Sequence, residues 1–126
     1  MTKRFTIGKN ERLKSRKAID LLFREGKRFT ISPFRVFYCE TGQVELLAGV
    51  GVGTKNFKKA VDRNRIKRQA REAWRLQKGQ LKEQLIQNGK GLHVFFIFTE
   101  KSLPAYEQVF EAITIIIGKL KKLVEK

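Results

Sequence analysis

The sequence predicts an α/β fold of the α+β type, a two-layer sandwich with a mixed sheet of about four strands and three helices, in the order α-β-β-β-α-β-α. Three observations predict it. A chain of 126 residues is long enough for one domain and short for two. Apolar residues recur at helical spacing in three long segments. Aromatic and β-branched residues fill the segments between them. We therefore expect residues 1–126 to form a single domain.

The first part of the chain is expected to form one helix and two or three strands. Ser15 can cap a helix over residues 16–25, which has apolar residues at helical spacing and ends at a glycine. Aromatic and β-branched residues then predict a short edge segment from Phe29 and a strand over residues 34–39, with Pro33 between them.

The next strand is expected over residues 44–52 and runs into the pattern GVGVG. This pattern lacks the lysine and the spacing of a phosphate-binding loop. The glycines therefore indicate a bulge or the close approach of another group to the backbone.

The longest predicted helix spans residues 58–78, which contain no glycine or proline. At about 100° per residue, apolar side chains lie on one face of this helix and arginines on the other. The apolar set is Ile66, Ala70, Ala73 and Trp74. The arginine set is Arg65, Arg68, Arg71 and Arg75. We expect the apolar face to be buried against the sheet and the basic face to be exposed.

Three further segments complete the predicted fold. A shorter helical stretch covers residues 80–87. Residues 92–99, with the sequence LHVFFIFT, are expected to form a central strand that is buried on both faces. Pro104 opens a final helix with apolar residues at spacings of three and four, and with lysines in its last turns, where they suit the helix dipole.

Positive charge is concentrated in two stretches of the chain. The sequence has 28 Lys and Arg against 12 Asp and Glu, which gives a net charge of +16. Residues 1–17 have seven basic side chains and one acidic, and residues 55–78 have ten basic and two acidic. A nucleic acid or an anionic membrane would bind such a surface. No run approaches the roughly 20 apolar residues of a membrane span, and no secretory signal is present. We therefore expect a cytoplasmic protein without a membrane partner.

The basic helix favours nucleic acid as the partner. Only Asp62 and Glu72 are acidic between Lys59 and Arg75, so like charges crowd along one face. A merely solvated helix face is the alternative. No zinc-finger, basic-zipper or clear helix-turn-helix pattern accompanies the helix, which favours RNA over DNA only weakly.

Catalytic and metal-binding patterns are not found in the sequence. Its carboxylates are scattered singly, and it has one cysteine, Cys39, and one histidine, His93. These two residues cannot build a thiolate metal cage or an internal disulfide. We therefore expect no catalytic residue, no bound metal and no bound cofactor.

Residues 58–75 read KKAVDRNRIKRQAREAWR, and the part from 60 to 68, AVDRNRIKR, strongly resembles the signature of the protein component of bacterial ribonuclease P. The resemblance extends along the chain, from the ERL of residues 11–13 to the final helix. It implies an α/β sandwich whose parallel βαβ connection through the arginine helix is left-handed. The chain departs from the family pattern at residues 53–55, where GTK replaces Ser, Lys and a second basic residue.

The resemblance implies a subunit of ribonuclease P, which removes the 5′ leader of precursor tRNA. Ribonuclease P RNA would perform the magnesium-dependent cleavage, and the basic protein would reduce the repulsion between the two RNAs. Ribonuclease P RNA and precursor tRNA are the implied partners, and no obligate protein partner is expected. A structural RNA-binding protein such as a ribosomal component is the alternative function, and an autonomous nuclease is a third.

The resemblance also implies two sets of contact residues. The contacts to the catalytic RNA are Lys55, Lys59, Arg63, Asn64, Arg65, Arg68 and Arg75. The contacts to the leader of precursor tRNA are Ile19, Phe23, Phe37, Tyr38, Lys67 and Arg71.

The leader is expected in a cleft between the first helix and the sheet, where aromatic side chains would support its bases. Phe37 and Tyr38 are neighbours on one strand, so only one of them can face the cleft. The family pattern favours Tyr38 for this position. For Ile19 and Phe23, burial in the core is an equal alternative.

Overall fold

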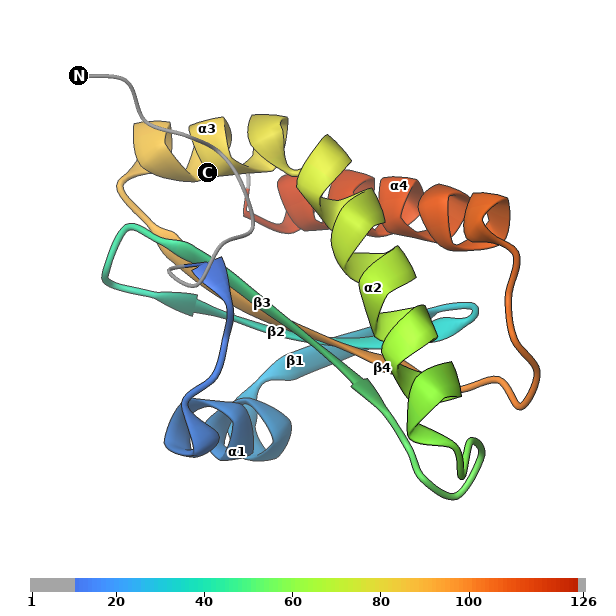
Figure 1. The fold of residues 1–126 in the computed structure, drawn as a ribbon. Helices are drawn as coiled ribbons and strands as arrows, with labels where there is room; N and C mark the ends of the chain where they lie inside the picture. Colours follow the sequence, from blue (N-terminus) through green and yellow to red (C-terminus); the bar gives the residue numbers. More distant parts are fainter. Residues whose placement is uncertain (1–10, 125–126) are drawn as a thin grey trace.

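The computed structural model of the protein describes residues 11–124. The two main layers are a four-stranded sheet and the helices α2, α3 and α4 packed on one of its faces, and the short helix α1 lies against the other face (Figure 1). This arrangement confirms the predicted two-layer α+β fold with a mixed sheet. The elements are α1 (Arg16–Glu25), β1 (Lys27–Ile31), β2 (Phe34–Thr41), β3 (Leu46–Val52), α2 (Ala60–Gln77), α3 (Gly79–Asn88), β4 (Gly91–Phe98) and α4 (Tyr106–Leu123).

The described part of the chain has four helices, because the predicted stretch 80–87 forms the separate helix α3. Gly89, with φ of +67°, ends α3 in the left-handed conformation that glycine adopts without steric cost. At the start of α1, the amide of Ala18 donates a hydrogen bond to Oγ of Ser15 at 3.2 Å, which confirms the predicted cap.

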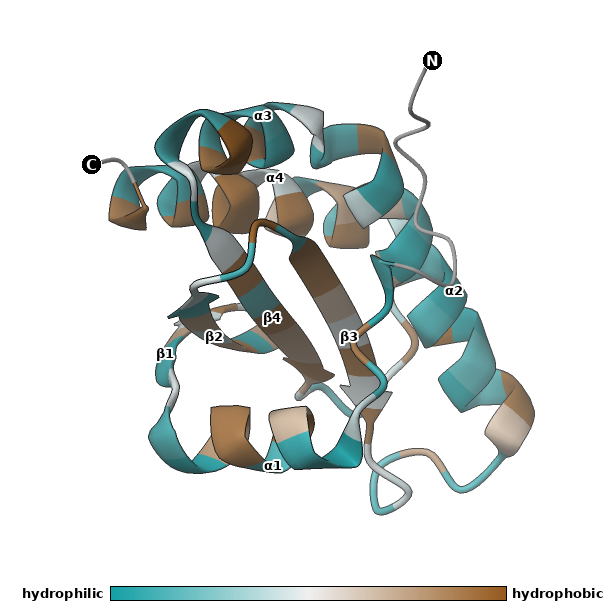
Figure 2. Ribbon diagram, turned by 90° about the vertical axis from the view of Figure 1, so that its left-hand side faces the viewer, coloured by the Kyte–Doolittle hydropathy of each residue, from teal (hydrophilic) through white to brown (hydrophobic). Residues whose placement is uncertain are grey.

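The strand order is β1-β2-β4-β3, with antiparallel pairs except for β3 and β4, which are parallel neighbours. The connection between the parallel strands passes through α2 and α3. Its left-handed sense stays a prediction from the resemblance. Strand β4 is central, as predicted, and lies between β2 and β3 (Figure 2).

Burial of β4 on both faces was expected, and it is complete only on the face toward α2, α3 and α4. Leu92, Val94, Phe96 and Phe98 are buried on that face. On the other face, Phe95 and Ile97 are half-buried, because the single helix α1 covers less of the sheet than three helices do.

The main core lies between the sheet and the three-helix layer. Helix α2 contributes Ile66, Ala70, Ala73 and Trp74, all buried as the helical spacing predicts. The Trp74 side chain is 1% exposed, and its ring lies 5.2 Å from that of Phe96 on β4. This contact confirms the assignment of the apolar face of α2.

The glycines of β3 allow a close contact on the α1 face of the sheet. A Cβ atom on Gly49 would lie 2.7 Å from the ring of Phe95 and 3.3 Å from the carbonyl oxygen of Leu13. Gly51 faces the same ring. Close approach to the backbone is therefore the reason for the glycine pattern, as one of the two readings of the sequence predicted.

Candidate nucleic-acid interface

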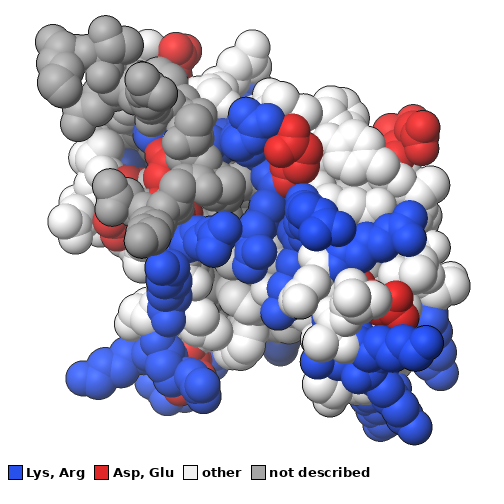
Figure 3. All heavy atoms as spheres, in the orientation of Figure 1, with Lys and Arg blue, Asp and Glu red and all other residues white. Residues whose placement is uncertain are grey.

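The basic residues of α2 face outward because the apolar side of the helix is buried in the core. Lys and Arg side chains form a band across the face of the molecule on which α2 lies (Figure 3). Five of the seven residues predicted to contact the catalytic RNA are exposed. They are Lys55, Lys59, Asn64, Arg65 and Arg68. The other two, Arg63 and Arg75, are half-buried and hydrogen-bonded within the protein.

Arg63 has a structural role that the sequence did not indicate. Its Nη1 donates hydrogen bonds to the backbone carbonyl of Phe57 at 2.7 Å and to that of Lys58 at 2.9 Å. These bonds tie the loop that precedes α2 to the first turns of the helix. The remaining Nε and Nη2 donors leave Arg63 with hydrogen-bonding capacity for RNA.

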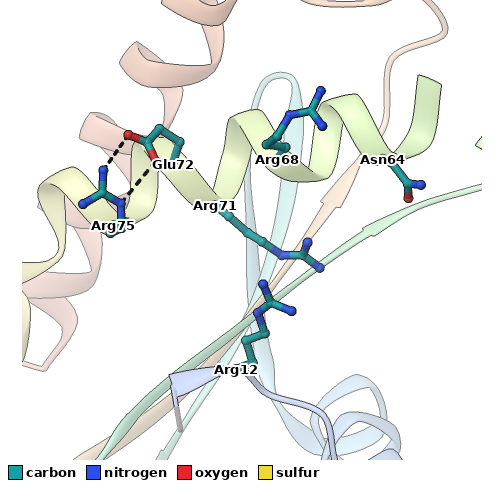
Figure 4. Close-up of a pocket in the computed structure, with 6 residues that line it drawn as sticks. All are labelled: Arg12, Asn64, Arg68, Arg71, Glu72 and Arg75. Atoms are coloured by element: carbon teal, nitrogen blue, oxygen red, sulfur yellow. Dashed lines mark hydrogen bonds and ion pairs between the residues drawn. The ribbon is translucent and has the colours of Figure 1, made fainter. Parts of the chain in front are cut away.

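A hollow of about 340 Å³ lies beside α2 and is rich in arginine (Figure 4). Its lining residues are Arg12, Asn64, Arg68, Arg71, Glu72 and Arg75. Five of them come from α2, and Arg12 comes from the segment before α1. Two parts of the chain that are far apart in sequence thus form one basic surface.

Arg12 and Arg71 point toward each other from opposite sides of this hollow (Figure 4). Partial burial lowers the pKa of Arg71, and the positive charge of Arg12 lowers it further. The one carboxylate among the lining residues belongs to Glu72, and it accepts two hydrogen bonds from Arg75, at 3.2 Å and 2.6 Å. A phosphate between Arg12 and Arg71 would relieve their repulsion and accept hydrogen bonds from both.

The sequence-based contact sets do not correspond to separate places on α2. Arg71, expected to contact the leader, lines the same hollow as Arg68, expected to contact the catalytic RNA. Lys67 is half-buried and lies outside the residues that line the hollow. Arg12 was not among the predicted contacts, although the ERL of residues 11–13 belongs to the resemblance and was the signal that could have indicated it.

The second candidate surface is an aromatic cluster between α1 and the sheet. The Phe23 ring lies 4.8 Å from that of Phe37 and 5.2 Å from that of Phe95. Phe23 is 38% exposed, whereas Phe37 is 6% exposed beneath it. Ile19 is half-buried in the same cluster. Of the four residues predicted to support the leader, Phe23 therefore offers the accessible ring.

Tyr38 lies on the opposite face of the sheet, so the expectation that it faces the α1 side is wrong. It belongs to the main core, is 9% exposed, and packs against the ring of Phe29 at 5.7 Å. Burial raises the pKa of its phenol. The alternation of side chains along β2 directs Phe37 to the α1 side and Tyr38 to the three-helix layer.

Residues 11–124 lack both a metal-ligating cluster and a helix that could span a membrane. These residues contain no group of three or more His, Cys, Asp or Glu side chains that could hold a metal ion. His93 Nε2 lies 3.0 Å from Oε2 of Glu45, and burial raises the pKa of the Cys39 thiol. No helix in this part of the chain is both long and apolar enough to cross a membrane.

Comparison with known proteins agrees with this architecture. The family model described as "Ribonuclease P" matches residues 7–121. A ribonuclease P protein component from Porphyromonas gingivalis strain W83 is 38% identical over an alignment of 112 residues that covers 86% of this chain and 81% of the relative. The corresponding protein of Thermotoga maritima is 34% identical over 109 residues, covering 86% and 85% of the two chains.

Solved structures with the same fold include the RNase P protein from Thermotoga maritima. It superposes with a TM-score of 0.71 and 28% sequence identity, covering 86% of this chain and 96% of that chain. The RNase P protein of Staphylococcus aureus has a TM-score of 0.63 over 90% of this chain and 97% of its own, and at 19% identity it supports the fold alone. The match to the family model and the two relatives lead to one conclusion: the chain belongs to the ribonuclease P protein family.

Proposed function

We propose that this subunit of ribonuclease P, which acts in tRNA 5′ processing, binds the catalytic RNA through the arginine face of α2 and supports the leader of precursor tRNA beside α1. The arginine hollow is the observation that carries this proposal. Four arginines, Arg12, Arg68, Arg71 and Arg75, line it with a single carboxylate. Such a surface suits the phosphates of a folded RNA.

Arginine suits this task because its planar guanidinium can donate two parallel hydrogen bonds to a phosphate. Each phosphate that is neutralised releases counterions, and this release favours binding at low salt. The two-sided geometry of the hollow adds selectivity for shape, since a phosphate must reach both Arg12 and Arg71.

We assign the leader of precursor tRNA to the α1 side of the sheet. Phe23 offers its exposed ring as a stacking surface, and Phe37 supports that ring from below. The Arg28 guanidinium carbon lies 5.8 Å from the Phe37 ring centroid, so a positive charge lies beside the aromatic cluster. Stacking and charge would hold a single strand without reading its sequence.

The cleavage itself we assign to the RNA subunit, which would also hold the magnesium ions that the reaction requires. The protein would need no cofactor and no obligate protein partner, and the cytoplasmic location stays a prediction. Its contribution would be to reduce the repulsion between two polyanions, so that less magnesium is needed to bring them together.

A cleavage assay at low magnesium tests this function. Precursor tRNA with a labelled 5′ leader is incubated with the catalytic RNA alone, with the protein alone, and with both. We expect cleavage at the mature 5′ end only when both are present. Cleavage by protein freed of RNA would indicate an autonomous nuclease. Binding to the RNA without any gain in cleavage would indicate a structural RNA-binding protein.

A further inference from the structure

A partly buried ion cluster lies next to the arginine hollow. The carboxylate of Glu11 accepts hydrogen bonds from Nζ of Lys78 through Oε1 and from Nζ of Lys82 through Oε2. Lys78 is 1% exposed and is the only Lys, Arg, Asp or Glu side chain among residues 11–124 that is buried. It stands between α2 and α3, so Glu11 is bound at the junction of these helices.

Glu11 is one of two anchors that flank Arg12. The other anchor is Leu13, whose amide donates a hydrogen bond to the carbonyl of Ala48 on β3 at 2.9 Å and whose side chain is buried between α1 and the sheet. Arg12 itself forms a parallel bridge with Ala48. The guanidinium of Arg12 therefore extends from a short segment that is held on both sides.

We propose that Glu11 is a positioning residue, whose ion pairs with Lys78 and Lys82 hold the Arg12 guanidinium in the hollow opposite Arg71, ready for an RNA phosphate. This inference rests on the proposed function. The segment needs such a restraint because Arg12 and Arg71 carry like charges and repel each other before RNA binds.

The energetics of the cluster fit positioning better than general stabilisation. Burial lowers the pKa of Lys78 in spite of the neighbouring Glu11 carboxylate, so the charged form of this lysine is less favourable in the folded protein than in the unfolded chain. A buried ion pair often contributes no more to stability than apolar side chains of the same size would. The cluster instead fixes the position of Glu11, the residue that precedes Arg12.

The substitution Glu11→Gln tests the proposal, because an effect of overall charge and a positioning role predict opposite changes in RNA affinity. Removing a negative charge from a basic protein should strengthen RNA binding if only the overall field matters. If Glu11 positions Arg12, the same substitution should weaken binding to the catalytic RNA, by roughly tenfold at most for one phosphate contact. Glu83→Gln is the matched control, because it makes the same charge change at an exposed position on α3.

A double-mutant cycle shows whether the effect passes through Arg12. In the Arg12→Ala background, Glu11→Gln should no longer weaken RNA binding. Glu11→Gln alone could lower stability by leaving Lys78 buried without its partner. The double variant Glu11→Gln with Lys78→Met avoids this, because it keeps the net charge and removes the buried lysine. It should also weaken RNA binding.

Three results would overturn the positioning role: affinity of Glu11→Gln equal to that of Glu83→Gln, a loss that persists in the Arg12→Ala background, or wild-type affinity of the charge-neutral double variant. The proposed function is judged separately by Arg68→Ala. If Arg68→Ala weakens binding and Glu11→Gln does not, only the positioning role fails. If neither Arg68→Ala nor Arg12→Ala weakens binding, the proposed RNA surface fails.

Discussion

The two faces of the sheet differ in how completely helices cover them. Three helices cover one face, and the side chains between them and the sheet, such as Trp74 and Phe96, are almost entirely buried. One ten-residue helix covers the other face, where Phe95 remains half-buried and Phe23 is exposed. The difference indicates that the first face provides most of the folding stability. The second face can therefore keep aromatic side chains accessible to a ligand.

The largest expected effect of a single substitution is on the fully covered face. Trp74→Ala should destabilise the protein by about 3 to 5 kcal/mol, because it removes a large buried ring and leaves a cavity against Phe96. A fall in Tm of more than about 10 °C should accompany it. Leu76→Ala is the control on the same helix, where the side chain is exposed and the effect should be small. Equal melting curves for Trp74→Ala and wild type would contradict this assignment.

The arginine hollow should affect RNA binding without affecting folding. Arg68→Ala with Arg71→Ala should flatten the plot of log affinity for the catalytic RNA against log salt by about 0.7 to 0.9 per lost contact. The melting temperature should change little, since neither side chain is buried in the core. Lys101→Ala with Lys122→Ala removes the same charge from exposed positions elsewhere and should change the slope less. An unchanged slope in the arginine variant would exclude direct phosphate contacts there.

The α1 face of the sheet should contribute to the binding of tRNA with a leader and not to the binding of mature tRNA. Phe23→Ala removes a stacking surface worth about 1 to 3 kcal/mol per base, so binding of leader-bearing precursor tRNA should weaken while binding of mature tRNA stays unchanged. Leu21→Ala removes an exposed apolar side chain from the same helix and serves as the control. Equal weakening for both tRNA forms would show that α1 does not contact the leader.

The smallest expected effect concerns the pH dependence of stability. Burial lowers the pKa of Lys78 in the folded protein, whereas the unfolded chain keeps the ordinary value of about 10.4. The unfolded state therefore holds this proton more tightly, and stability rises as the pH increases from the lowered pKa toward the ordinary one. The free energy of unfolding, measured with urea, should increase more from pH 7 to pH 10 for wild type than for Lys78→Met. A difference that stays constant or changes in the opposite direction would contradict the lowered pKa.

Local patterns in the sequence were sufficient for most of the fold. Helical spacing identified the buried face of α2, including Trp74, because that face depends only on the period of the helix. The alternation along β2 showed that Phe37 and Tyr38 face opposite sides, but it could not show which side α1 covers. That choice depends on how α1 packs against the finished sheet, and the family pattern led to the wrong residue.

The contacts that complete the candidate site depend on the path of the chain over long distances. Arg12 enters a hollow formed by α2, and Glu11 pairs with a lysine 67 residues further along the chain. No period or spacing in the sequence encodes such an encounter. Arg63 was correctly placed in the basic helix, but its bonds to the preceding loop depend on how that loop folds back.

The bridge between Arg12 and Ala48 also has a consequence for the behaviour of the protein at high concentration. Strand β3 lies at the edge of the sheet, and its sequence, LLAGVGV, contains no charge. Uncharged edge strands of this kind tend to pair with other chains and start aggregation. The amide of Leu13 donates a hydrogen bond to the carbonyl of Ala48 at this edge, and Arg12 places a positive charge beside it. The segment that supplies an arginine to the hollow therefore also covers part of the β3 edge, which disfavours pairing with a second copy at Ala48.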